Sequence, residues 1–399
     1  MKRRGNTWTA IGFLLVVTLT LGYMLLLACM GKSSLVDAAK QIQPSISSFT
    51  AFVNQSEAAL NEDLDKKHVF IQFYGGVQRL CGKRVIEDEA LSAKVLKLST
   101  GALNFYYSAN DVDISPTAQL VNDFSLALAN QGIPYLYVAV PQKIQSGQEK
   151  ELLPPGIQEY SNRNADRFLT LLQEKETDTY DLRPLFSSSG NYQDWFFRTD
   201  HHWKPEAAFF AWKNIAKMLS VRYGIETNPQ YLNDSSYQKR IYEDYFLGSQ
   251  GKRVGSFYAG VDDITEYIPT FTTSFTYNSP SFSQPRSGSF NQSLLFHERI
   301  TQRDWFNANP YTLYAGGDYG IATITNHQSS NGKKILLIRD SFGCAFTPFL
   351  ALSCSELTTI DLRYFEGNLM ETIQAVDPDL VITLYCVSSI SNQALFQFY

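Results

Sequence analysis

The sequence has few of the residues that build metal centres and disulfide frameworks. Among its 399 residues are five cysteines and five histidines, and the cysteines lack the close spacing of zinc ligands. We therefore expect no zinc site and no disulfide-rich scaffold. A single bridge, such as Cys344 to Cys354, is compatible with an oxidising compartment, although nothing in the sequence requires it. No metal and no other cofactor is expected.

Basic residues are few as well. The chain has 34 Lys and Arg against 39 Asp and Glu, a formal net charge of −5. Three of the basic residues, at positions 2 to 4, precede an apolar run at the N-terminus, so the remainder is more acidic still. It has no basic cluster, which argues against a nucleic-acid partner. There is no internal repeat, and a hydrophobic content of 44% excludes wholesale disorder.

The N-terminal apolar run extends from about Trp8 to Met30 without a charge. As a helix it is long enough to cross a hydrocarbon layer of roughly 30 Å, and the basic residues before it favour a cytoplasmic N-terminus. Residues 1–31 are therefore predicted to be a single-pass anchor in the cell membrane, with the rest of the chain extracytoplasmic. Signal peptides usually have shorter apolar regions. Lipidation at Cys29 and simple cleavage are the alternatives, and both place the same domain outside.

Residues 32–67 show only a weak helical period and end in a charged cluster. They are predicted to form a stalk helix or linker between the anchor and a domain that spans residues 68–399. This domain opens with the segment HVFIQFYGG at position 68 and with residues 85–108, which suggest short strands around turns.

Strand and helix patterns alternate through most of this domain. The run IPYLYVAVP and the later runs KILLI, LTTI and DLVITLY are apolar on both faces, as in central parallel strands that helices cover on both sides. Alternating β and α units predict an α/β fold with a doubly wound, mostly parallel sheet. The helical patterns cover residues 117–132, 162–176, 204–224, 342–353 and 366–376.

Residues 225–330 differ from this pattern, because they are rich in Tyr, Phe, Ser, Thr, Asn and Gly. We interpret them as a β-rich insertion that forms one wall of a cleft. Aromatic loops of this kind suit stacking on a carbohydrate, but they occur as often in the core of a β-rich subdomain.

Ser341 lies where the chemistry of an open α/β sheet is concentrated, between a buried strand and the start of a helix. A hydroxyl is exposed there, and backbone amides at a helix start can stabilise a developing oxyanion. The alternative is that Asp340 or Ser341 only caps the helix, which is the usual role of these residue types at this position.

The segment TDHHW supplies a base and its orienting partner. In an extended backbone, residues two apart point to the same side, so Asp200 and His202 can be neighbours while His201 faces away. Asp200 would then hold the imidazole in the required tautomer, and His202 would take the Ser341 proton. Trp203 would wall the pocket. A metal site at Asp200, His201 and His202 is the alternative, but it lacks further ligands that the sequence would identify.

The segment TDHHWKPEAA, followed more than a hundred residues later by a strand that ends in RDSFG, resembles the DHHW proteins and the periplasmic alginate O-acetyltransferases. Both are SGNH hydrolase-like, and in this branch the Asp and His precede the nucleophile in the chain, as they do here. The resemblance covers roughly residues 68–399. It implies that Asp200 and His202 are the Asp-x-His pair and that Ser341 is the nucleophile. It also implies O-acetylation of a polysaccharide, with a multi-pass membrane protein that delivers the acetyl group.

The sequence departs from the family pattern around the oxyanion hole. Arg339 replaces the usual glycine before Asp-Ser, and the glycine and asparagine blocks of standard SGNH enzymes have no clear counterpart. The backbone amide of Ser341 is the natural first donor. Arg363, Tyr364 and Lys143 are candidate substrate or oxyanion contacts, but a strand-end salt bridge or a packing role explains Arg363 and Tyr364 equally well.

Three functions remain open at this point. The first is an acyl-transfer enzyme that acetylates a cell-envelope polysaccharide through an acyl-serine intermediate. The second is a carbohydrate acetyl esterase with the same triad, in which water replaces the sugar as acceptor. The third is a non-catalytic protein that uses the aromatic insertion to hold a glycan.

Overall fold

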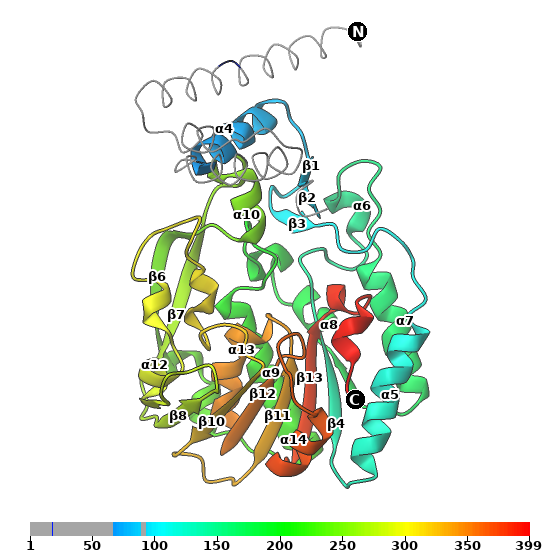
Figure 1. Ribbon diagram of the computed structural model, residues 1–399, viewed down its shortest axis with the longest axis vertical. Helices are drawn as coiled ribbons and strands as arrows, with labels where there is room; N and C mark the ends of the chain where they lie inside the picture. The colour runs from blue at the N-terminus through cyan, green and yellow to red at the C-terminus, as the bar shows by residue number, and fades with distance from the viewer. Residues whose placement is uncertain (1–17, 19–66, 89–92) are drawn as a thin grey trace, which may run out of the picture. The chain divides into compact units, whose positions relative to one another are not determined.

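The computed structural model describes Thr18, residues 67–88 and residues 93–399 (Figure 1). Apart from Thr18 and Lys67, the predicted anchor and the predicted stalk lie outside the described residues. Within the described residues, no helix has the length and apolar character needed to cross a membrane. The chain divides into two compact units, residues 1–71 and 72–399, and the larger unit carries all the predicted chemistry.

A mixed eight-stranded sheet forms the centre of the larger unit (Figure 1). Five neighbouring strands are parallel, and three further strands add to one edge in antiparallel pairing. The predicted α/β fold is therefore confirmed, and the sheet is mixed, with its antiparallel strands at one edge. In spatial order the strands are β5 (Thr179–Asp181), β4 (Tyr135–Val140), β13 (Leu380–Cys386), β11 (Lys334–Arg339), β12 (Glu356–Ile360), β10 (Ile321–Asn326), β8 (Phe275–Asn278) and β9 (Arg286–Gly288).

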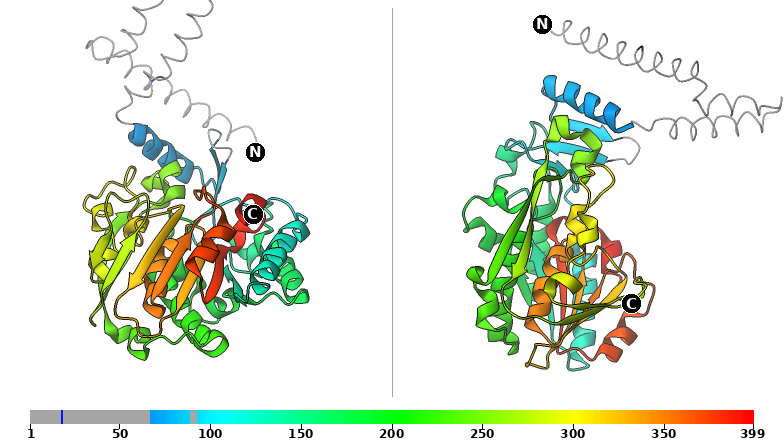
Figure 2. Two further views of the ribbon diagram at one scale, coloured as in Figure 1. Left: turned by 60° about the horizontal axis from the view of Figure 1, so that its bottom comes forward. Right: turned by 90° about the vertical axis from the view of Figure 1, so that its left-hand side faces the viewer.

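The central strands are apolar on both faces because helices cover both faces. In β11, Ile335 and Leu337 enter one hydrophobic cluster, while Leu336 and Ile338 enter the other. Figure 2 shows the sheet flanked by helices on both sides. Helices α9 (Pro205–Tyr223) and α13 (Gly343–Leu350) contribute to the first cluster, and α5 (Ser115–Ala129), α7 (Ser161–Glu174) and α14 (Leu369–Val376) contribute to the second.

Helix α9 follows the DHHW segment directly, and its sequence fixes both of its ends. Pro205 occupies the first helical turn, where its missing N–H is not needed. Gly224 ends the helix in the left-handed region, with φ of 62°, a conformation that glycine adopts without steric cost. The predicted boundaries of this helix are therefore confirmed, and they place the DHHW segment just before its N-terminus.

The prediction of a strand at HVFIQFYGG was wrong, because this segment lies in helix α4 (Lys67–Leu80). Its β-branched and aromatic residues are also compatible with a helical spacing, as Phe73 and Val77 show. Gly75 is required inside this helix, since a Cβ there would stand 1.8 Å from the carbonyl oxygen of Val254. The predicted short strands that follow are present as β1 (Val85–Asp88), β2 (Ala93–Lys97) and β3 (Leu103–Phe105).

The segment 225–330 divides into two parts. Strands β6 (Tyr237–Phe246) and β7 (Asp262–Pro269) form a separate antiparallel pair, whereas β8, β9 and β10 extend the central sheet. The β-rich character of the insertion is thus confirmed, although three of its five strands belong to the main sheet. The remaining short helices are α6 (Glu149–Leu152), α8 (Arg183–Ser187), α10 (Ser249–Val254), α11 (Ser256–Ala259) and α12 (Phe290–Ser293).

The cysteines of the described residues are all free. Cys344, Cys354 and Cys386 are buried and Cys81 is exposed. The bridge between Cys344 and Cys354 that the sequence permits is therefore not formed. Cys344 instead contacts the Asp318 carboxylate at 3.0 Å.

Candidate active site

Ser341 lies in a short segment between β11 and α13, which we call the nucleophile turn (residues 339–342). The carboxylate of Asp340 accepts hydrogen bonds from the Phe342 N–H at 3.0 Å, the Cys386 N–H at 2.8 Å and the Ser389 hydroxyl at 3.0 Å. Burial raises the pKa of Asp340. No side chain caps α13; the Asp340 carboxylate instead holds the turn before the helix, and the Ser341 hydroxyl is left for other contacts.

Arg339, which replaces the usual glycine, is not among the residues that line the pocket beside Ser341. Its guanidinium is 1% exposed and donates to the Asp318 carboxylate and to the Gly317 carbonyl, each at 2.7 Å. Burial lowers the pKa of Arg339, but the negative groups around it, Asp318 among them, raise this pKa by more. Arg339 therefore has a raised pKa and stays charged. Arg339 therefore does not cover the nucleophile.

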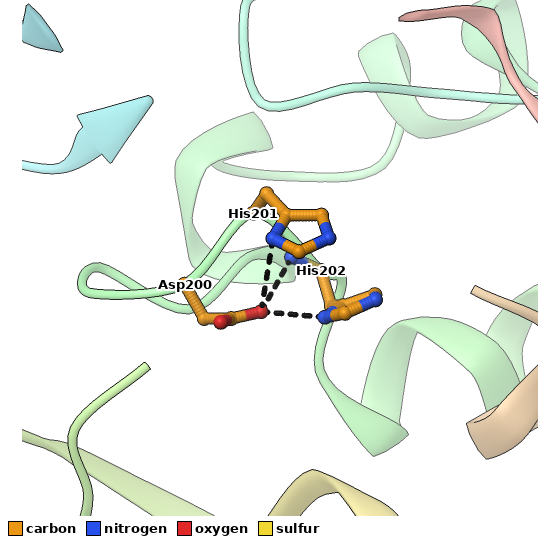
Figure 3. A group of neighbouring side chains, drawn as sticks. All are labelled: Asp200, His201 and His202. Carbon is orange, nitrogen blue, oxygen red and sulfur yellow. Dashed lines mark hydrogen bonds and ion pairs between the residues drawn. The ribbon is translucent and has the colours of Figure 1, made fainter. Parts of the chain in front are cut away.

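Asp200 and His202 lie in an irregular segment that we call the base loop (residues 199–203). Oδ1 of Asp200 accepts hydrogen bonds from the His202 backbone N–H at 3.0 Å and from His202 Nδ1 at 2.5 Å (Figure 3). Burial would raise the pKa of Asp200, but its interactions with the two neighbouring imidazoles and the hydrogen bonds that it accepts from His202 and from the Ser249 N–H hold this pKa well below its usual range. The carboxylate stays ionised and fixes the proton of His202 on Nδ1.

The two segments meet at a hydrogen bond. Nε2 of His202 lies 2.7 Å from Oγ of Ser341, so Asp200, His202 and Ser341 form one continuous relay. Tyr311 of the insertion stacks on the His202 ring, with centroids 4.1 Å apart and planes tilted by 14°. The structure therefore brings together the three residues that the sequence singled out, in the order that a serine nucleophile requires.

The prediction that His201 faces away from this group was wrong. The base loop bends rather than running as an extended strand, so both imidazoles lie beside the Asp200 carboxylate (Figure 3). Nδ1 of His201 is 3.0 Å from the Ser249 hydroxyl and 3.6 Å from Asp200 Oδ1. Burial, followed by the charge of His202, lowers the pKa of His201 to about 3.

Neighbouring elements hold the base loop from outside. The Asp262 carboxylate of β7 accepts the backbone N–H groups of Arg198 and Thr199 at 2.8 and 2.7 Å. The Ser249 N–H donates to Asp200 Oδ2 at 2.6 Å. A Cβ at Gly248 would stand 2.2 Å from the Asp200 Cβ, so only glycine permits this close approach. Most of this support comes from the 225–330 segment.

Ser341 opens into a pocket of about 510 Å³ at the carboxyl ends of the parallel strands. None of the residues along this pocket belongs to 225–330, so the prediction that the insertion walls the cleft was wrong. The insertion instead holds the base loop in place through the hydrogen bonds described above. The pocket is lined by Tyr107, His201, Asp340, Ser341, Phe342, Arg363, Ser388, Ser389, Ser391, Asn392 and Leu395.

The remaining predicted contacts have different positions. Arg363 lines the pocket and also forms ion pairs with Asp361 and Asp318. Its position thus agrees with both interpretations from the sequence, a pocket residue and a strand-end salt bridge. Tyr364 is 56% exposed and is not among the lining residues. Its carbonyl lies against Gly320, where a Cβ would be 2.3 Å away.

Lys143 and Trp203 are buried beneath the site. Nζ of Lys143 donates to the carbonyls of Asp200, at 2.5 Å, and Leu103, and burial lowers its pKa to about 7. The Trp203 indole donates to the Phe342 carbonyl at 2.9 Å and is fully buried. Both residues therefore join the base loop to its surroundings and do not line the pocket.

The group Asp200, His201 and His202 also has the composition of a metal site, because its ligand atoms lie within 4.8 Å of one another. The Asp200 oxygens and both Nδ1 atoms are already engaged, however. Both Asp200 oxygens accept hydrogen bonds, and the Nδ1 atoms face Ser249 and Asp200. The arrangement fits a hydrogen-bonded relay better than a coordination shell.

Several pocket residues were not predicted from the sequence. Ser388, Ser389, Ser391 and Asn392 follow β13 directly, and Tyr107 follows β3. The signal that could have identified the first group is their place after a buried parallel strand, at the same sheet edge as Ser341. Tyr107 gave no such signal.

Comparisons with known proteins agree with this fold. Residues 103–241 match the family model described as SGNH hydrolase-like domain, acetyltransferase AlgX; the matched range contains Asp200 and His202 but not Ser341. No curated protein matches the chain in sequence.

Two solved structures share the fold. PatB1 of Bacillus cereus, solved with a sulfonyl adduct, is 21% identical with a TM-score of 0.63, over 77% of this chain and 98% of its own. A DHHW family protein from Eubacterium siraeum is 20% identical with a TM-score of 0.59, over 79% and 97%. The resemblance that the motifs indicated is thus confirmed: the chain has an SGNH hydrolase-like fold, and its residues 103–241 match the acetyltransferase model of that group.

Proposed function

We propose that this protein is an acyl-transfer enzyme that moves an acetyl group through Ser341 onto a hydroxyl of a cell-envelope polysaccharide. The observation that carries the proposal is the relay from Asp200 through His202 to Ser341, with Nε2 of His202 2.7 Å from Oγ of Ser341. Ser341 also lines the pocket, so an acyl donor has access to it. The match to an acetyltransferase model supports the same class of reaction.

In the first half of the reaction Ser341 Oγ attacks the acyl carbonyl carbon while His202 Nε2 takes its proton. The tetrahedral intermediate collapses as His202 returns this proton to the leaving oxygen, which leaves acetyl-Ser341. In the second half His202 takes a proton from the acceptor hydroxyl, which attacks the acetyl carbon, and then returns it to Ser341. Asp200 remains ionised throughout and stabilises the imidazolium.

The oxyanion needs donors that face the pocket. Among the described residues, the backbone N–H of Ser341 donates to no acceptor, so it is free to donate to the oxyanion. Arg363 supplies a fixed positive charge in the same pocket, since its two carboxylate partners raise its pKa. We propose the Ser341 amide as the first donor and Arg363 as the second contact.

A polysaccharide acceptor suits the wall of the pocket, which is rich in hydroxyl and amide groups from Ser388, Ser391 and Asn392. We also propose that the uncharged run from Trp8 to Met30 anchors the chain and that the domain is extracytoplasmic. A multi-pass membrane protein would then have to supply the acetyl group. If water replaces the sugar in the same open pocket, the enzyme is an acetyl esterase.

The proposal is tested with the purified chain, a chromogenic acetyl ester as donor and oligosaccharides as acceptors. We expect release of the chromophore together with acetylated sugar, detected by mass spectrometry, and loss of both in Ser341→Ala. Ser188→Ala, the same change at an exposed serine that does not line the pocket, should retain the activity. Chromophore release without acetylated sugar would favour the esterase, and no turnover by the unaltered protein would contradict both enzyme functions.

A further inference from the structure

The pocket contains a second imidazole that the relay does not use. The rings of His201 and His202 lie with centroids 3.8 Å apart and planes tilted by 36°. Figure 3 shows that each ring turns Nδ1 toward Asp200 and directs Nε2 to the opposite side. Because Nε2 of His202 contacts Ser341 on that side, Nε2 of His201 points to the region in which the nucleophile lies.

His201 is held firmly in this orientation. Its Nδ1 lies 3.0 Å from the Ser249 hydroxyl, and its ring lies among the rings of Phe105, Tyr107 and Phe342 at centroid distances of 5.8, 6.4 and 6.0 Å. The side chain is 22% exposed and lines the pocket. Within the part of the chain that the structure describes, Nε2 of His201 makes no hydrogen bond, whereas Nδ1 does.

The ring of His201 is neutral at physiological pH, because burial and the charge of His202 lower its pKa to about 3. A neutral imidazole has one N–H and one lone pair. The nearby Asp200 carboxylate favours the proton on Nδ1, so Nε2 presents its lone pair to the pocket. A neutral neighbour also does not oppose the positive charge that His202 acquires during the reaction.

We propose that His201 Nε2 binds the acceptor, by accepting a hydrogen bond from the hydroxyl next to the one that His202 deprotonates. This inference rests on the proposed function. The chemical class of acceptor is a vicinal diol, such as two hydroxyls on neighbouring carbons of a pyranose, because two imidazoles that face the same way can each engage one of them. A water molecule occupies only the position next to His202 Nε2 and has no second hydroxyl for His201 to bind. His201 therefore favours a sugar over water as the acceptor.

The test compares His201→Gln with His201→Asn. An Asn side chain places its amide near the position of Nδ1, whereas a Gln side chain extends its amide to the position of Nε2, so the two variants differ in which nitrogen they replace. For each variant we would measure hydrolysis of a chromogenic acetyl ester and acetyl transfer to a methyl pyranoside, in the same reaction. A matched monohydroxy alcohol serves as the acceptor without a second hydroxyl.

We expect the ratio of acetyl transfer to the pyranoside over ester hydrolysis to be about 10- to 100-fold lower in His201→Asn than in the unaltered enzyme, the effect of losing one hydrogen bond to the acceptor. Transfer to the monohydroxy alcohol should not change, and His201→Gln should recover much of the transfer to the pyranoside. Retained hydrolysis shows that the relay is intact and that the variant is folded.

A fall of hydrolysis and transfer by the same factor in both variants would overturn the inference, because His201 would then act only in packing. Equal transfer by His201→Asn and by the unaltered enzyme would overturn it as well. Failure of the proposed function is distinguishable, since the unaltered enzyme would then transfer acetyl to no acceptor before any variant is compared.

Discussion

The nucleophile turn and the base loop meet at one hydrogen bond, yet they are held in different ways. The nucleophile turn continues strand β11 of the central sheet, and its own side chains fix it: Asp340 binds three donors and Arg339 is paired in the core. The base loop has no regular structure. Residues from other elements fix it, namely Asp262, Ser249 and Lys143.

This difference assigns a role to the segment 225–330. It does not wall the pocket, but it supplies Asp262, Ser249 and Tyr311, which hold the base loop and the His202 ring. Changes far from the pocket in this segment should therefore affect the position of the base, whereas the position of the nucleophile should depend on the central sheet.

The largest effect is expected for Asp200→Asn, which removes the anchor of the base loop without changing its volume. An amide in place of the carboxylate no longer holds the Nδ1 proton of His202 or stabilises the imidazolium. We expect kcat to fall by about 10⁴-fold, as in other serine relays, while circular dichroism stays unchanged. A loss below about tenfold would mean that Asp200 only packs against His202.

The next effect separates steric support from chemistry. In Gly248→Ala the new Cβ would stand 2.2 Å from the Asp200 Cβ and 2.7 Å from its backbone nitrogen, so the base loop must move. We expect kcat to fall by about 10²-fold, the usual result of a displacement near 1 Å in a catalytic group. Gly76→Ala is the control, because its Cβ would lie 3.7 Å from Phe257. Equal activity of the two variants would contradict the account.

Asp262 and Asp340 are both buried carboxylates, and they hold the base loop and the nucleophile turn respectively. Variants at these two residues therefore compare how the two segments are held. Asp262→Asn and Asp340→Asn each replace one carboxylate oxygen by an amide NH2 group, which cannot accept the hydrogen bonds made at that oxygen. We expect each change to lower the free energy of unfolding by about 1–3 kcal/mol. If the two segments are held independently, the double variant should lose the sum of both within about 0.5 kcal/mol. Urea denaturation measures the free energy of unfolding of the two single variants and of the double variant. Strong non-additivity would show that the segments are stabilised as one unit.

The smallest effect concerns Lys143 and pH. Burial lowers its pKa to about 7 in the folded protein, whereas in the unfolded chain it is about 10.4. Between these values the unfolded chain binds more protons, so the stability contribution of this residue rises with pH. We expect the stability difference between the unaltered protein and Lys143→Met to rise by at most about 1.4 kcal/mol per pH unit from pH 7.5 to 9.5.

Urea denaturation at several pH values would measure this rise. Lys217→Met, at an exposed lysine of helix α9, should show no such rise. A difference between Lys143→Met and the unaltered protein that does not depend on pH would contradict the prediction.

The parts that the sequence predicted well are those in which one local pattern dominates. Strand β4 is apolar on both faces because it contributes side chains to both hydrophobic clusters, and this pattern is typical of a covered strand. Helix α4 was predicted wrongly because its apolar residues fit both a strand and a helix, and its glycines suggested a turn. Its contact with Val254, which requires Gly75, is visible only in three dimensions.

The prediction of the site was limited in the same way, by contacts between residues far apart in the sequence. Asp200, His202 and Ser341 were identified by residue type, spacing and the position of Ser341 after a strand. The orientation of His201 was missed because the base loop bends, and this bend depends on Asp262, which lies about sixty residues later in the chain. The pocket wall after β13 was missed because short polar residues carry no periodic signal.

The most direct test of the relay is covalent labelling of Ser341. A sulfonyl fluoride reacts with a hydroxyl that a neighbouring base activates. Peptide mass spectrometry after incubation should find the sulfonyl group on Ser341 of the unaltered protein and on no serine of the His202→Ala variant. Failure to label Ser341 in the unaltered protein, or equal labelling in His202→Ala, would contradict the claim that His202 activates Ser341.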